Sequence, residues 1–253
     1  MPAKTLETLS SLRSQGKPEM RYRLIVALDV PTAAAARGVV TRIGNAAGAY
    51  KVGLQLFTAE GPDFVRELVA SGRKVFLDLK LHDIPNTVAH AAKAASQLGV
   101  SMLTVHAAGS REMLRAAVEA AGSTSILAVT VLTSFKQDDL HEIGIPAQLP
   151  DQVLRMASLA RDCGCAGVVS SARETAMLRQ SMGEGLLIVN PGIRPAGAGL
   201  DDQERVATPA AAIAAGASHI VVGRPITQAD DPARAAEKIV QEMEQSQSSR
   251  PVD

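Results

Sequence analysis

The chain of 253 residues is poor in aromatic side chains, with four Phe, two Tyr and no Trp. A surface that stacks nucleic-acid bases needs several such rings, so the composition argues against a nucleic-acid partner. The charges also balance, at 26 basic and 26 acidic residues, and no net field attracts nucleic acid or anionic lipid. We therefore expect no nucleic-acid partner and no membrane partner.

Cysteine is nearly absent too. Cys163 and Cys165 are separated by a single residue, which is not the Cys-x-x-Cys spacing of metal or redox sites. We expect them to be small buried hydrophobic residues in a reducing compartment, which fits a cytoplasmic location. No apolar run approaches the roughly 20 residues of a membrane span, and residues 1–19 are too polar for a secretory signal.

Short apolar runs rich in β-branched residues are present, and they alternate with Ala-rich helical patterns. The predicted strands are residues 24–29, 50–54, 74–79, 102–106, 125–131, 167–170, 186–190 and 219–223. Helical patterns between them include 59–70, 88–98, 110–121, 152–162 and 209–215. Apolar strands that alternate with helices predict a parallel sheet buried on both faces.

This alternation predicts an α/β fold, a single-domain (β/α)8 TIM barrel. A doubly wound open sheet is the alternative, but Gly-x-Gly-x-x-Gly does not follow the first strand. We expect an N-terminal extension at 1–20, the barrel at 21–244 and a polar tail at 245–253.

Polar residues collect at the predicted carboxyl ends of the strands, where such barrels carry functional groups. Asp78 and Lys80 end the third strand and, by alternation, point to the same side, with Asp83 just beyond. Lys51 lies early in the second strand, so either that boundary is misplaced or Lys51 points into the interior from lower down. An interior lysine needs a carboxylate partner, and Asp29 and Asp78 are on the neighbouring strands.

Two Gly-Arg signals follow the last two strands. Gly192 and Arg194 follow the seventh strand, and Gly223 and Arg224 follow the eighth. Barrels commonly bind phosphate there. Gly lets backbone N–H groups approach an anion, and Arg adds a positively charged guanidinium that can donate two parallel hydrogen bonds. The small-residue loop at 196–202 is of a kind that can close over a ligand.

From about Tyr22 to about Ala236 the chain resembles the orotidine 5′-phosphate decarboxylase family of pyrimidine and UMP biosynthesis. The motifs that carry the resemblance are Ala27-Leu28-Asp29, Tyr50-Lys51-Val52-Gly53, residues 78–87, 131–134 and 191–194, Asp201-Asp202-Gln203, and Val222-Gly223-Arg224. The resemblance implies a cofactor-free, metal-free lyase that converts orotidine 5′-monophosphate into UMP and CO2. It also implies a homodimer with shared active sites.

The resemblance further implies residue roles. Lys80 protonates C6 of the pyrimidine, within a charge network of Lys51, Asp78 and Lys80 that Asp83 of the partner subunit joins. The implied substrate contacts are Asp29 and Lys51 at the ribose hydroxyls, Thr87 of the partner subunit near the ribose, Thr133 and Ser134 near the base, and Gln203, Gly223 and Arg224 at the phosphate, with Arg194 beside them.

Three rival functions remain open from the residues. A magnesium-dependent sugar-phosphate decarboxylase or aldolase shares Asp-x-Lys-x-x-Asp but resembles this chain less at Lys51, at Pro85-Asn86-Thr87 and at Gln203. A Schiff-base aldolase would use Lys80 or Lys51 as its nucleophile. A nucleotide sensor would bind without turnover.

The five histidines show no zinc-ligand spacing. We expect His106 to be either a core residue whose hydrogen bonds are satisfied or a pocket residue, and we favour the first.

Overall fold

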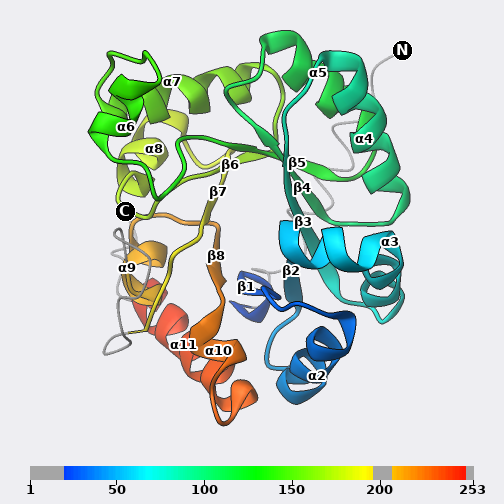
Figure 1. Ribbon diagram of the computed structural model, residues 1–253. Coiled ribbons are helices and arrows are strands. Elements are labelled where there is room, and N and C mark those ends of the chain that lie inside the picture. Colours follow the sequence, from blue (N-terminus) through cyan, green and yellow to red (C-terminus); the bar gives the residue numbers. More distant parts are fainter. Residues whose placement is uncertain (1–19, 196–206, 249–253) are drawn as a thin grey trace, which may run out of the picture.

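The strands form one closed barrel in the computed structural model, which describes residues 20–195 and 207–248 (Figure 1). All neighbouring strands pair in parallel and in sequence order, and β1 closes the barrel on β8. The strands are β1 (Leu24–Ala27), β2 (Ala49–Gly53), β3 (Lys74–Leu81), β4 (Met102–His106), β5 (Ser125–Val129), β6 (Gly167–Val169), β7 (Leu187–Asn190) and β8 (His219–Val222). The predicted (β/α)8 barrel is confirmed, and the closed pairing excludes an open sheet.

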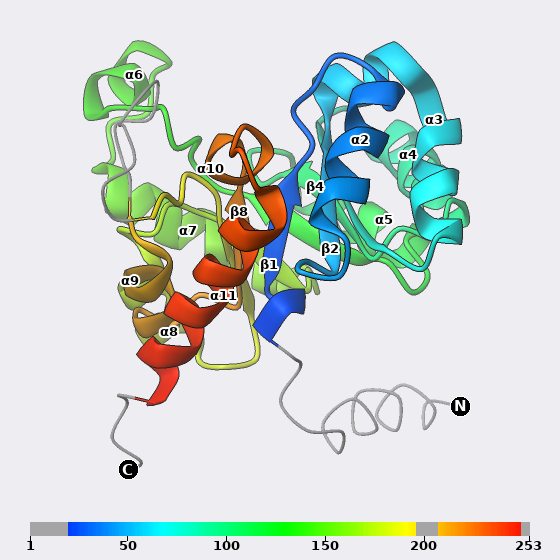
Figure 2. The same cartoon turned by 90° about the horizontal axis from the view of Figure 1, so that it is seen from below.

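Helices surround the strands (Figure 1). They are α2 (Ala33–Ile43), α3 (Leu54–Ala70), α4 (Pro85–Gln97), α5 (Arg111–Ala120), α6 (Gln137–Glu142), α7 (Leu149–Asp162), α8 (Thr175–Met182), α9 (Pro209–Ala214), α10 (Arg224–Thr227) and α11 (Pro232–Ser248), with the 3-10 turn η1 (Met20–Tyr22) before β1. Figure 2 shows α6 and α10 at the end of the barrel toward which the strands run.

Helix α3 begins earlier than the pattern predicted, at Leu54 rather than at residue 59. Gly61 has a φ of 67° and precedes Pro62, so the helix is kinked there. A proline removes a backbone donor and a glycine weakens the helical pattern, which is why the first part of this helix is hard to recognise.

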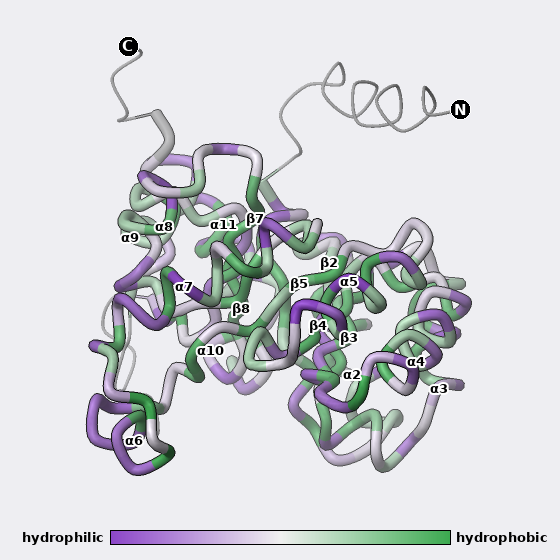
Figure 3. Tube along the Cα trace, turned by 90° about the horizontal axis from the view of Figure 1, so that it is seen from above, coloured by the Kyte–Doolittle hydropathy of each residue, from purple (hydrophilic) through white to green (hydrophobic). Residues whose placement is uncertain are grey.

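Apolar side chains pack on both sides of the strands. The larger cluster lies between strands and helices, and a smaller one fills the barrel interior. The interior cluster consists of Ile25, Ala27, Ala49, Phe76, Met102, Leu127, Val189 and Val221. Figure 3 shows hydrophobic residues along the central strands and hydrophilic ones mainly on the surrounding helices and loops. The interior is therefore a packed core, and the space for a ligand lies above it.

Both cysteines are buried and unbridged, each 6% exposed. Burial, with the neighbouring Cys163 adding to it, raises the pKa of the Cys165 thiol to about 12. A thiol that stays protonated is a poor nucleophile. The expectation that these residues are small buried hydrophobics is confirmed.

The chain ends bear on the predicted boundaries. Met20, the last residue of the predicted extension 1–20, packs into the core cluster and thus belongs to the barrel. Helix α11 runs through Ser248 and thus covers the first four residues of the predicted tail 245–253. No helix in the described ranges is both long and apolar enough to cross a bilayer.

Candidate active site

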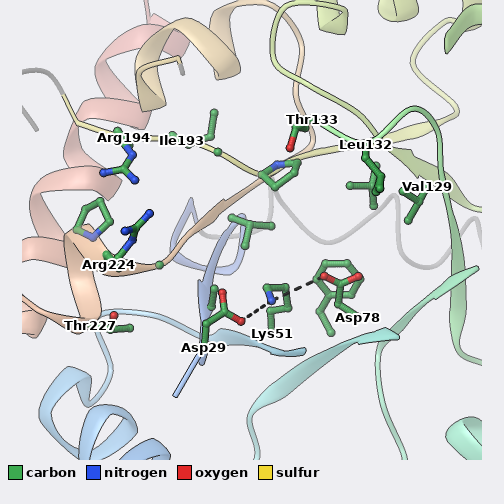
Figure 4. Close-up of a pocket in the computed structure, with 18 of the residues that line it drawn as sticks. Asp29, Lys51, Asp78, Val129, Leu132, Thr133, Ile193, Arg194, Arg224 and Thr227 are labelled. Carbon is green, nitrogen blue, oxygen red and sulfur yellow. Dashed lines mark hydrogen bonds and ion pairs between the residues drawn. The ribbon is translucent and has the colours of Figure 1, made fainter. Parts of the chain in front are cut away.

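A pocket of about 470 Å³ opens at the carboxyl ends of the strands (Figure 4). Its volume lies within the range of small-molecule sites. Eight of the site residues predicted from the sequence line it: Asp29, Lys51, Asp78, Lys80, Thr133, Arg194, Gly223 and Arg224. The strand order brings together residues that are nearly 200 positions apart in the chain.

Four of these residues form a row of alternating charge. Lys51 Nζ lies 2.8 Å from Asp29 Oδ1 and 3.7 Å from Asp78 Oδ2, while Lys80 Nζ lies 2.9 Å from Asp78 Oδ1. The side chains of Lys51 and Asp78 are only 12% and 13% exposed, so each needs its opposite charge nearby. The predicted network of Lys51, Asp78 and Lys80 is present within the single chain.

Lys51 reaches this row from the middle of β2. It pairs with Phe76 of β3 at the level of the interior core, two residues before Gly53, which pairs with Asp78. A Cβ on Gly53 would lie 2.8 Å from Lys51 Nζ and 3.2 Å from Asp29 Oδ1. The missing side chain thus leaves the space through which the lysine extends upward. Of the two alternatives for Lys51, the structure shows the interior position.

Lys80 has an unusual backbone. Its φ is 50°, and no other residue except glycine has a positive φ in the described chain. The left-handed region costs a residue with a Cβ about 1 kcal/mol or more. Residues held in such conformations often lie at functional sites, where their surroundings over-determine them.

Arginines lie across the pocket from this row (Figure 4). Arg194 follows β7 and is 7% exposed, and its backbone N–H donates to Ala207 O. Gly223 is the residue before α10, and the exposed Arg224 is the first residue of that helix. The pocket therefore has a row of lysines and carboxylates on one side and two arginines on the other.

Apolar side chains line the pocket between these two sides. They come from the strand ends and the loops that follow, and none of them was predicted as a site residue: Phe76, Val129, Val131, Leu132, Val169, Ile193 and Val221. The signal for Phe76 was its position two residues before Asp78 on the same face of β3. An apolar wall beside the charges lowers the local dielectric and strengthens their interactions.

Three of the described residues among those predicted are not part of this pocket lining. Asp83 and Thr87 are exposed beyond the end of β3, and the Asp83 carboxylate accepts the Ile84 backbone N–H. Ser134 is exposed next to Thr133. Gln203 and the loop 196–202 lie outside the described residues, so their predicted roles remain predictions.

His106 at the end of β4 lies outside the pocket lining. Its ring stacks on His82 with the centroids 5.4 Å apart, and its Nδ1 accepts the Ala108 backbone N–H. Burial lowers the pKa of His106, and the nearby His82 and Lys80 lower it further.

Within 20–195 and 207–248 no group of three or more His, Cys, Asp or Glu side chains could hold a metal ion.

Thr104 on β4 is a residue of the site that was not predicted from the sequence. It is fully buried, accepts the Lys80 backbone N–H at 2.8 Å and donates to Asp78 Oδ1 at 3.0 Å. A signal existed, because Met102 faces the barrel interior and alternation places Thr104 on the same face. A lone threonine in an apolar strand is otherwise unremarkable, since threonine is a common strand residue.

A closed (β/α)8 barrel with ion-paired lysines and carboxylates at the mouth of its pocket has the architecture of a barrel enzyme. The family model described as orotidine 5′-phosphate decarboxylase / HUMPS family matches residues 22–239. The chain belongs to this family.

Comparisons with individual relatives give the same family. The chain is 54% identical over 225 residues to orotidine 5′-phosphate decarboxylase of Halorhodospira halophila, a match that covers 87% of this chain and 95% of the relative. It is 48% identical over 249 residues to the enzyme of that name from Moorella thermoacetica, covering 94% and 99%. Among solved structures, that of orotidine 5′-phosphate decarboxylase from Lactobacillus acidophilus superposes with a TM-score of 0.79 at 40% identity, covering 87% and 98%.

Proposed function

We propose that this protein is a carboxy-lyase that converts orotidine 5′-monophosphate into UMP and CO2 in pyrimidine biosynthesis. The observation that carries the proposal is the row Asp29–Lys51–Asp78–Lys80 on one side of a pocket whose other side carries Arg194 and Arg224. The names of the relatives support the same substrate.

Lys80 is the proposed proton donor. Loss of CO2 from C6 leaves a carbanion that no adjacent carbonyl fully delocalises. Very slow reactions of this kind need on the order of 20 kcal/mol of barrier reduction. A fixed ammonium meets the developing negative charge and then donates its proton to C6. The ion pair with Asp78 at 2.9 Å fixes the position of that ammonium.

Asp78 has a second proposed role, beside the departing carboxylate of the substrate. Two like charges ~4 Å apart repel by about 4 kcal/mol at an effective dielectric of 20. This repulsion is relieved as neutral CO2 leaves, so it contributes a minor share of the barrier reduction. In this proposal Asp29 and Lys51 contact the ribose hydroxyls, and Thr133 and Ser134 are near the base.

Gly223 and Arg224, with Gln203 and Arg194, are the proposed phosphate site. The phosphate is remote from the C6 carboxylate, and binding energy gained there can be used to position the reacting atoms. We propose a reaction without metal or cofactor. The Lys51 ammonium already lies between the Asp29 and Asp78 carboxylates and supplies the positive charge that a divalent cation would otherwise bring there. We place the enzyme in the cytoplasm, in keeping with two unbridged cysteines.

A homodimer would complete the site. Asp83 and Thr87 are exposed beside the pocket, and two large apolar side chains are exposed at the ends of neighbouring strands: Leu54 at 55% after β2 and Ile84 at 66% after β3. A second copy that covers these apolar residues would bring its own Asp83 and Thr87 near the mouth of the first pocket. Such an interface would explain why charged and large apolar side chains are exposed close to one another.

The direct test mixes chelator-treated protein with orotidine 5′-monophosphate and follows the loss of its ultraviolet absorbance. Rapid conversion to UMP without metal is expected. Lys80→Ala should lose turnover by several orders of magnitude and still bind UMP, since the ammonium acts mainly on the transition state. Conversion of sugar phosphates with magnesium, and none of the nucleotide, would establish the rival function instead.

A further inference from the structure

The pairing of β3 with β4 is irregular where the site begins. Leu77 pairs with Leu103, and the next pair is Leu81 with Val105. Four residue steps on β3 are thus matched by two on β4, and Lys80 with its left-handed backbone lies inside this bulge. The ordinary ladder of backbone hydrogen bonds is interrupted there, so another group must bind the freed donors and acceptors.

The Thr104 hydroxyl does so from the opposite strand. Its Oγ1 accepts the Lys80 backbone N–H at 2.8 Å and donates to Asp78 Oδ1 at 3.0 Å. The donor and acceptor roles follow from the partners, since a backbone N–H can only donate and a carboxylate can only accept. The same Asp78 oxygen also accepts from Lys80 Nζ at 2.9 Å. One buried hydroxyl therefore joins the backbone of Lys80 to the carboxylate that holds the Lys80 ammonium.

We propose that Thr104 is a positioning residue for the proposed decarboxylation, on which this inference rests. It fixes the left-handed backbone of Lys80 and the orientation of the Asp78 carboxylate, and so directs the ammonium into the pocket. Thr104 is fully buried and is not among the residues that line the pocket, so it acts through Lys80 and Asp78 rather than on the substrate.

The test compares three variants. Thr104→Val keeps the shape and removes the hydroxyl, whereas Thr104→Ser keeps the hydroxyl and removes the methyl group. Thr124→Val is the matched control. Thr124 directly precedes β5, at the end of the barrel opposite the pocket. It is 6% exposed, and its hydroxyl donates to Val100 O rather than to a site residue. All three are first shown to be folded by their thermal unfolding.

We expect Thr104→Val to lower kcat 10- to 100-fold, as misplacement of a catalytic group by about 1 Å does, with KM and UMP affinity within threefold of wild type. Thr104→Ser and Thr124→Val should keep kcat within threefold. Wild-type kcat in folded Thr104→Val, or an equal loss in Thr124→Val, would overturn the proposal, as would a serine variant as slow as the valine variant.

A second measurement does not depend on turnover. Hydrogen exchange of the Lys80 backbone amide should be at least tenfold faster in Thr104→Val than in wild type and unchanged in Thr104→Ser. Equal protection in the valine variant would show that Thr104 does not hold this backbone. Wild-type protein that leaves orotidine 5′-monophosphate unconverted would refute the proposed function, and the exchange rates would still decide whether Thr104 fixes Lys80.

Discussion

At the scale of single residues, the site depends on side chains that are small or missing as much as on charges. Lys51 starts at the level of the interior core and still reaches Asp29 and Asp78, because Gly53 leaves its path open. The backbone of Gly53 has a φ of −97°, which any residue can adopt. Glycine is thus required here for space and not for conformation.

Gly53→Ala should therefore lower kcat/KM by about 10- to 100-fold with little loss of stability. The new Cβ would lie 2.8 Å from Lys51 Nζ, and the flexible lysine would move aside rather than the backbone. Steady-state kinetics and urea unfolding measure the two effects. Gly38→Ala, in α2 with open space at its Cβ, is the control, and it should keep full activity and gain about 0.5–1 kcal/mol. Unchanged kinetics in Gly53→Ala would contradict this account of Lys51.

At the scale of elements, β6 is short and closely packed. It has three residues, and its first, Gly167, pairs with Leu187 of β7. A Cβ on Gly167 would collide with the Leu187 carbonyl oxygen and would lie 3.0 Å from Leu127 Cδ2 in the interior core. The contact atoms belong to backbone and packed core, so they cannot move aside easily.

We expect Gly167→Ala to lower the free energy of unfolding by about 1–3 kcal/mol, the usual cost of overpacking a core. Urea denaturation measures it. Gly185→Ala in the exposed segment before β7 has nothing within 4 Å of its Cβ and should change stability by less than about 0.5 kcal/mol. Equal stability of the two variants would show that β6 and β7 can separate at no cost.

The strands were predictable from the sequence to within about two residues, because buried parallel strands give continuous apolar runs bounded by turns. Helix α11 was not named, although Ala236, Ile239 and Met243 repeat with helical spacing and are fully or almost fully buried. The charged residues were predictable from motif and alternation. The left-handed backbone of Lys80 and the role of Thr104 were not, because both depend on the register between β3 and β4, which the sequence of either strand alone does not define.

At the scale of the whole molecule, two of the predicted site residues lie outside the pocket of the single chain. The row from Asp29 to Lys80 is formed within the chain, whereas Asp83 and Thr87 are exposed outside its pocket. The exposed Ile84 next to Asp83 fits an interface rather than a free surface. Assembly and catalysis are therefore expected to be coupled.

Mixing two inactive variants tests this coupling. Lys80→Ala subunits keep Asp83, and Asp83→Ala subunits keep Lys80, so each mixed dimer contains one complete site. Random exchange should restore about a quarter of wild-type activity, since half of the dimers are mixed and each has one working site of two. Either variant mixed with itself is the control. Mass spectrometry verifies that the subunits have exchanged. If activity does not recover after verified exchange, Asp83 does not belong to a shared site.

The burial of both cysteines has a practical consequence for such experiments. Cys163 and Cys165 are each 6% exposed, and the Cys165 thiol remains protonated at neutral pH. Maleimide dyes and spin labels react with exposed thiolates, so the natural chain should stay unlabelled. A single cysteine introduced on the exposed rim, as in Ile84→Cys, would then be the one reactive thiol of each subunit. Fluorescence or distance measurements could follow subunit association without first removing a native cysteine.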